Sequence, residues 1–101
     1  MNFSDPLDRR LDRRIPLGCA ATLRSPQGER WEAQCLDLSV GGMTLVTAYV
    51  PGEGEVVEVE VQPPAERPTA PPLRVTARVK RCHDRGGGHY ELGLETVRVI
   101  A

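Results

Sequence analysis

Four arginines stand close together near the start of the chain, in the stretch RRLDRR over residues 9–14. The guanidinium group of arginine is a flat fork of N–H donors that binds phosphate through two parallel hydrogen bonds. The same fork grips the O6/N7 edge of guanine, and its face stacks on bases. The side chains of Arg9, Arg10, Arg13 and Arg14 could therefore bind a ligand that carries both phosphates and bases.

A second polar cluster, DLSVGG over residues 37–42, follows the arginines. Asp37 is an acceptor that suits the N1–H and N2 amino donors of guanine, and Ser39 can donate to a phosphate oxygen or to the backbone. Gly41 and Gly42 either let a ligand approach the main chain or permit positive φ in a turn between strands. Together the two clusters are complementary to a guanine nucleotide with phosphates.

Each cluster also has an ordinary structural interpretation. Arginines interspersed with aspartates are typical of a solvated helical face, and Asp-x-Ser before two glycines is typical of a turn. A hydrolase would use Ser39 with Asp37 and one of the two histidines, His83 or His89. No nucleophile-elbow pattern surrounds Ser39, and the histidines flank a glycine-rich turn, so no catalytic site is predicted. Cys82 beside His83 has no second ligand pair with zinc-like spacing, so no metal site is predicted.

Size and charge exclude several classes of protein. A chain of 101 residues has the size of one domain, and a formal net charge of −1 argues against a general nucleic-acid binder. A small RNA-binding barrel remains an alternative, although one Phe, one Trp and two Tyr are few for base-stacking platforms. The sequence has no apolar run long enough to span a membrane and no signal-peptide core, so we expect no membrane insertion and a cytoplasmic protein. The odd cysteine count without a CxxC pair predicts reduced thiols in Cys19, Cys35 and Cys82.

Most of the chain carries strand patterns. EVVEVEVQ over residues 55–62 alternates valine with glutamate, and LRVTARVKRC over residues 73–82 alternates apolar with basic residues. Weak helix signals are confined to residues 4–14, and five prolines within residues 63–72 predict a loop. The other predicted strands cover residues 17–25, 30–39, 42–47 and 89–100.

Six short strands with no long helix between them predict an all-β fold, a six-stranded antiparallel barrel with a flexible N-terminal arginine-rich arm. The arm covers residues 1–16 and the barrel residues 17–101. One pattern conflicts with simple alternation, because Trp31 and Cys35 look like core residues yet share strand parity with Asp37 and Ser39. Either a bulge shifts the register near Leu36, or the outer face of the barrel is partly apolar there.

In combination, these features resemble the PilZ domain, a bacterial six-stranded barrel that binds cyclic di-GMP. That family carries RxxxR in an N-terminal arm, followed by D/N-x-S-x-x-G at the end of a strand. Arg10 and Arg14 match the first motif, ahead of an arginine, apolar, proline junction in RRIPL, and DLSVGG matches the second. Arg9 and Arg13 form another RxxxR pair, one residue earlier. ARVKR and YELGLE resemble the family's last strands, including a late glycine, Gly93.

The resemblance implies a receptor and no enzyme. Arg10 and Arg14 would bind the phosphates and guanine edges of cyclic di-GMP, and Arg9 could add a contact. Asp37 and Ser39 would read guanine from the barrel, and Gly41 and Gly42 complete the implied site. No cofactor is implied, and the implied partner is a downstream effector protein that senses ligand-dependent ordering of the arm. The alternative is an adaptor that keeps the barrel, binds no nucleotide and acts only through protein–protein contacts.

Overall fold

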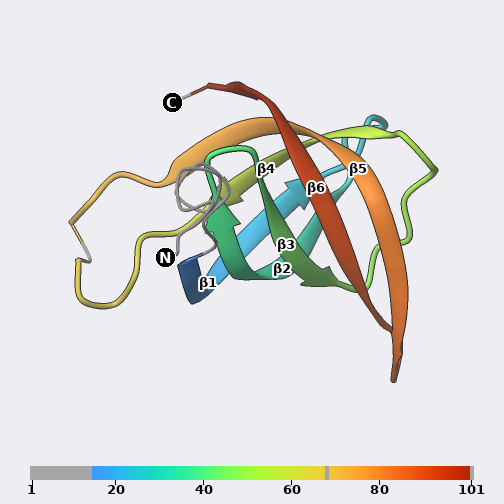
Figure 1. Ribbon diagram of the computed structural model, residues 1–101, viewed down its shortest axis with the longest axis horizontal. Coiled ribbons are helices and arrows are strands. Elements are labelled where there is room, and N and C mark those ends of the chain that lie inside the picture. Colours follow the sequence, from blue (N-terminus) through green and yellow to red (C-terminus); the bar gives the residue numbers. More distant parts are fainter. Residues whose placement is uncertain (1–14, 68, 101) are drawn as a thin grey trace, which may run out of the picture.

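Six strands form a closed antiparallel barrel in the computed structural model, which describes residues 15–67 and 69–100 (Figure 1). In chain order they are β1 (Ile15–Arg24), β2 (Arg30–Ser39), β3 (Gly42–Thr47), β4 (Val56–Val61), β5 (Leu73–Gly86) and β6 (His89–Val99). Around the barrel the order is β1, β2, β3, β6, β5, β4, and pairing of β4 with β1 closes the ring. The predicted six-stranded antiparallel barrel is therefore confirmed. Residues 1–14 of the predicted flexible arm lie outside the described residues, whereas Ile15 and Pro16, which were assigned to the arm, begin β1.

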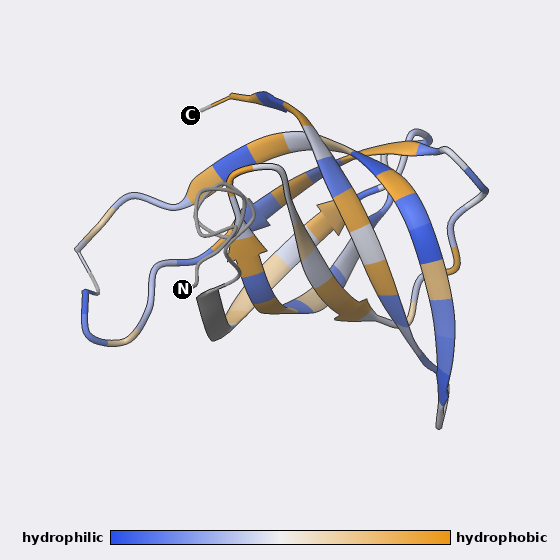
Figure 2. Ribbon diagram, in the orientation of Figure 1, coloured by the Kyte–Doolittle hydropathy of each residue, from blue (hydrophilic) through white to orange (hydrophobic). Residues whose placement is uncertain are grey.

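A single hydrophobic core fills the barrel. On β4, Val57, Val59 and Val61 are buried while Val56 and Glu58 are exposed, and the same alternation appears as orange and blue bands on the strands in Figure 2. Burying one large apolar side chain contributes about 1.5–3 kcal/mol, so this core is the main source of stability of the barrel. The largest side chains that are fully enclosed are Leu23, Met43, Leu45 and Leu92. No helix able to cross a membrane occurs in residues 15–67 or 69–100.

Two strand boundaries differ from those predicted by more than one residue. β1 begins at Ile15 rather than Leu17, because Pro16 is accommodated opposite Asp37 at an irregular start of the strand. β5 runs on to Gly86 rather than ending at Cys82, and with β6 it forms a two-stranded ribbon that extends beyond the barrel (Figure 1). Residues 81–89 are all exposed, so this ribbon has no core to impose an alternating pattern on the sequence.

The three cysteines occupy two different environments. Cys19 and Cys35 are register partners across β1 and β2, and both are buried in the core, whereas Cys82 is exposed on the ribbon. Burial, together with the nearby Asp37 and Cys19, raises the pKa of the Cys35 thiol to about 11. Because the thiolate is the reactive form, this thiol is expected to be inert near neutral pH.

Thiol labelling tests this arrangement. In native protein at pH 8, Ellman's reagent should react rapidly with one thiol, and Cys82→Ser should remove that fast phase. After denaturation without reductant, all three cysteines should react, as predicted for reduced thiols. Recovery of only one thiol under those conditions would reveal a bond between Cys19 and Cys35 and contradict the prediction.

Candidate ligand-binding site

A β-bulge determines which way the side chains at the end of β2 point. Cys35 pairs with Leu45 and Asp37 pairs with Thr44, so Leu36 is an additional residue with no counterpart in β3. Such an extra residue reverses the alternation of inward and outward side chains beyond it. Of the two explanations that the sequence left open, the structure shows the bulge at Leu36.

The consequence of the bulge is visible in burial. Cys35 is fully enclosed, and Leu38 also packs against the core, on the far side of the bulge. Asp37 and Ser39 alternate with Leu38, so both lie on the outer face of the barrel, half-buried. Trp31, before the bulge, is partly buried and packs against the core. Because of the one extra residue, Trp31 and Cys35 face the core before the bulge and Leu38 does so after it, which leaves Asp37 and Ser39 on the outer face.

The DLSVGG cluster lies where β1 begins. Ile15 pairs with Leu38, and Pro16 pairs with Asp37. The arm precedes Ile15 in the chain, so it joins the barrel beside this cluster. The predicted arm residues that lie outside the described part of the chain are Arg9, Arg10 and Arg14.

Hydrogen bonds fix the turn that follows β2. The Ser39 hydroxyl donates to the carbonyl oxygen of Gly42 at 3.3 Å, and the Gly41 carbonyl accepts from the N–H of Thr96 in β6 at 2.9 Å. Neither glycine has positive φ, so this turn does not use that property. A Cβ on Gly42 would lie 2.1 Å from the carbonyl oxygen of Leu94, whereas a Cβ on Gly41 would meet nothing within 4 Å. Close packing of β6 therefore already requires glycine at position 42.

Asp37 belongs to a row of residues that crosses four strands. The register pairs Asp37 with Thr44, Thr44 with Gly93, and Gly93 with Arg81, which leads from β2 through β3 and β6 to β5. The Arg81 guanidinium lies over Gly93, with Nη2, Cζ and Nε at 2.8, 2.9 and 3.0 Å from the position that a Cβ would occupy. The late glycine thus leaves room for an arginine that the sequence analysis did not single out.

The histidines of the hydrolase alternative lie far from Ser39. Ser39 pairs with Gly42, and Gly42 pairs with Glu95, whereas His89 is at the opposite end of β6 and His83 pairs with Glu91. Six strand positions separate residues 89 and 95, about 20 Å at strand rise. The structure therefore does not assemble the Ser39 and histidine groups into one site. Within the described ranges, no group of three or more His, Cys, Asp and Glu residues could hold a metal ion.

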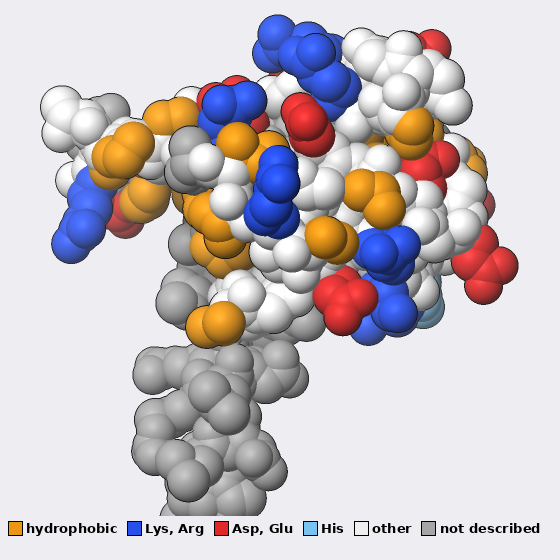
Figure 3. All heavy atoms as spheres, turned by 90° about the horizontal axis from the view of Figure 1, so that it is seen from above, with side chains coloured by type: hydrophobic (Ala, Val, Ile, Leu, Met, Phe, Trp, Pro, Cys, Tyr) orange, Lys and Arg blue, Asp and Glu red, His pale blue; other side chains and the backbone are white. Residues whose placement is uncertain are grey.

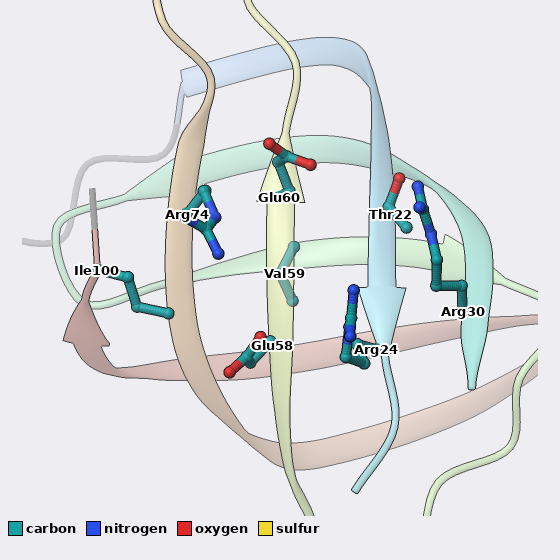
Figure 4. Close-up of a pocket in the computed structure, with 8 residues that line it drawn as sticks. All are labelled: Thr22, Arg24, Arg30, Glu58, Val59, Glu60, Arg74 and Ile100. Carbon is teal, nitrogen blue, oxygen red and sulfur yellow. The ribbon is translucent and has the colours of Figure 1, made fainter. Parts of the chain in front are cut away.

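A separate hollow of about 80 Å³ lies on the outer face of β1, β4 and β5 (Figure 4). Its charged side chains pair across strands, with Arg24 opposite Glu58 and Arg74 opposite Glu60. Opposite charges on neighbouring strands stabilise a sheet modestly and offset one another. The hollow includes none of the predicted site residues.

Surface charge is mixed on the face shown in Figure 3. Basic and acidic side chains are interspersed among the coloured residues of that view, without a broad basic area. A basic patch or stripe is the usual mark of nucleic-acid binding. This face therefore offers no electrostatic footprint for a nucleic-acid backbone.

Comparison with known proteins identifies the family. A family model of the PilZ domain matches residues 8–100. Among solved structures, the inhibitor of motility MotI/DgrA of Bacillus subtilis is similar, with a TM-score of 0.74, 21% identity and 92% of this chain covered; this chain spans 44% of that protein. The PilZ domain of YcgR from Escherichia coli, solved with c-di-GMP, has a TM-score of 0.67 and 17% identity, with 88% of this chain and 78% of that chain covered.

No curated protein matches the chain. At such low identities, the two solved structures establish a common fold. The family assignment rests on the sequence match, which runs from the arm to the end of β6. The chain therefore belongs to the PilZ domain family.

Proposed function

We propose that this chain is a cyclic di-GMP-binding receptor or adaptor that signals through ligand-dependent ordering of its N-terminal arm on the barrel. One observation carries the proposal: the bulge at Leu36 turns Asp37 and Ser39 outward, beside the point where the arm joins β1. Family membership supports it, and the PilZ domain of YcgR was solved with this ligand. Reduced thiols and an intracellular ligand favour a cytoplasmic location.

In this proposal, recognition involves no covalent chemistry. The Asp37 carboxylate accepts from the N1–H and N2 amino groups of guanine. Ser39 donates to Gly42 and retains lone pairs that accept from a ligand N–H. Arg10 and Arg14 bind phosphates and guanine edges from the arm, and Arg9 adds a further cation.

Calorimetric titration with cyclic di-GMP tests binding, with GTP and a short RNA as controls. The wild-type protein should bind cyclic di-GMP saturably, and Asp37→Ala should weaken the affinity by about 1–3 kcal/mol because an acceptor for guanine is lost. The melting temperature of each free protein is measured in parallel. A large loss of stability with unchanged affinity would leave Asp37 only a structural role. No binding by the wild-type protein would favour the adaptor that uses protein contacts alone.

Ordering of the arm is tested by amide hydrogen exchange. Four arginines repel one another, and Phe3, Leu7 and Leu11 offer too little apolar area to fold alone. We therefore expect the amides of residues 2–14 to exchange freely without ligand and to gain protection with saturating cyclic di-GMP. Such ordering creates a surface that an effector protein can recognise only in the bound state. Protection already present without ligand would make the arm part of the static fold and refute the switch.

A further inference from the structure

We propose that the open edge of β5 in the β5–β6 ribbon, residues 80–85, is a docking site for an extended, acidic segment of a partner protein, which adds to the sheet as a further strand. This inference goes beyond the proposed function, because it involves no cyclic di-GMP and no residue of either sequence motif. Extended peptides bind other sheets in this way, with main-chain hydrogen bonds giving affinity and side chains giving specificity.

The first argument is that β4 covers only the first half of β5. Pairing of β4 with β5 ends at Val56 and Arg78, whereas pairing of β6 with β5 runs on to Gly86 in the ribbon that extends beyond the barrel (Figure 1). Within the described ranges, residues 80–85 therefore have β6 on one side and no strand on the other. Such an edge presents unpaired N–H and C=O groups to a chain that can pair with it.

The second argument is the direction of these main-chain groups. The N–H of Val79 donates to the Glu55 carbonyl oxygen at 2.8 Å, so the main chain of Val79 faces the β4 side. Lys80, the next residue, is an extra residue in the pairing with β6. Main-chain groups alternate between the two sides of a strand, and the extra residue shifts this alternation by one position. Cys82 and Asp84 therefore present their N–H and C=O groups on the open side.

The third argument is the space beside the edge. A hollow of about 280 Å³ lies between the loop that precedes β4 and the start of the ribbon. The loop contributes Pro51, Gly52 and Glu53, and β5 contributes residues 79–82. Among the described residues, no main-chain hydrogen bond joins this loop to residues 80–85. A side chain of an added strand can therefore enter beside β5 without displacing an existing pairing.

The fourth argument is charge, which identifies the occupant. Residues 80–85 carry three cations, Lys80, Arg81 and Arg85, against one carboxylate, Asp84. Two of these cations contact β6 carboxylates at 3.8 Å, and such contacts between exposed side chains contribute little. A second copy of the edge would set cations against cations, and lysine and bulges keep edge strands from pairing with one another. Carboxylates on an added strand would lie opposite these cations, which favours an acidic partner.

The covered half of β5 shows what kind of strand fits. The strand that pairs there is β4, which alternates valine with glutamate in EVVEVEVQ over residues 55–62. Its Glu60 pairs with Arg74 of β5, and its Val57 and Val59 are buried in the core. An added strand with the same alternation would continue this arrangement along the ribbon, with carboxylates beside the cations.

Titration of the full chain with the blocked peptide Ac-EVVEVEVQ-NH2, without cyclic di-GMP, tests the inference. The peptide should bind saturably, and KVVKVKVQ should bind about tenfold more weakly because like charges then face each other. Cys82→Pro removes an edge N–H that β6 does not use, and it should weaken binding of the acidic peptide about tenfold. Cys82→Ser keeps that N–H and, as the matched control, should bind like wild type. The double variant Lys80→Glu/Arg85→Glu should also bind the acidic peptide more weakly.

Amide hydrogen exchange locates the bound peptide. The amides of Cys82 and Asp84 should gain protection in the complex, because they donate to the added strand. Unchanged protection at both amides would place the peptide elsewhere and overturn the inference. Loss of protection in β4 would show that the peptide replaces that strand within the barrel, which would also overturn it.

The remaining outcomes decide the occupant. No saturable binding, or wild-type affinity in both Cys82→Pro and the charge-reversed double variant, would overturn the docking site. Dimers in sedimentation equilibrium that Cys82→Pro abolishes would make a second copy the occupant and refute the acidic partner. Urea unfolding shows whether each variant is folded, and the charge-reversed variant, which leaves the main chain unchanged, tests the site independently of proline. Each result stands whether or not the wild-type protein binds cyclic di-GMP.

Discussion

Replacing Gly42 with alanine should lower the free energy of unfolding by about 3 kcal/mol, the upper end of the usual cost of overpacking. The added Cβ would lie 2.1 Å from the carbonyl oxygen of Leu94 and 3.2 Å from its carbonyl carbon. These are main-chain atoms of β6, which is paired with β3 on one side and β5 on the other, so they cannot move aside cheaply. Urea denaturation of the free protein measures the loss.

Gly41→Ala is the matched control for this prediction. It adds the same methyl group at the adjacent position, where the Cβ meets nothing within 4 Å and φ is not positive. Its stability should stay within about 0.5 kcal/mol of wild type. Equal losses in the two variants would mean that the turn, rather than the approach of β6, limits the substitution.

Glycine at position 42 could be needed for contact with a ligand or for packing of the barrel, and the clash with Leu94 bears on that choice. The Ser39 hydroxyl donates to the Gly42 carbonyl, so displacing β3 would also disturb the turn that follows Asp37. A loss of ligand binding in Gly42→Ala would therefore require no contact between Gly42 and the ligand. The packing of β6 against β3 is by itself enough to require glycine at position 42.

Strands with one face in water and one in the core were predictable, because that alternation is visible in the sequence. Val57, Val59 and Val61 reveal the inward face of β4 in the sequence itself. The β5–β6 ribbon was not predicted at its full length because both its faces are exposed and neither imposes alternation. The arm prediction stays a prediction for residues 1–14, since these lie outside the described part of the chain.

In the row that runs from Asp37 across the barrel to Arg81, only the Asp37 end was predictable from the sequence. The parity conflict between Cys35 and Asp37 indicated either a bulge or a partly apolar outer face, and the structure shows a bulge at Leu36. On β5, Arg81 shares the parity of Val79, and a basic residue at the end of an alternating strand gives no comparable conflict with a known motif. The bulge at Lys80 depends on the pairing of β5 with β6, which sequence periodicity alone does not specify.

Arg10→Ala and Arg14→Ala should each weaken cyclic di-GMP binding by about 2–4 kcal/mol, roughly 30- to 700-fold. Each change removes a charge-assisted, bidentate contact to phosphate or guanine, which lysine would restore only in part because it lacks the planar fork. Calorimetric titration measures the affinity. Because the closed barrel is made by residues 15–99, the unfolding transition of both variants should match wild type.

Arg9→Ala and Arg13→Ala are the controls, because these residues form the RxxxR pair one position earlier. Both should cost less affinity than the changes at Arg10 and Arg14. The arm joins the barrel at Ile15, opposite Leu38, so a shift of one residue would change which guanidinium groups face the cluster that begins at Asp37. If Arg13→Ala proved the most severe of the four, the register assigned to the arm would be wrong, while a requirement for the arm itself would stand. Four equal and small losses would instead indicate diffuse electrostatic attraction, which rising salt concentration would abolish in all variants alike.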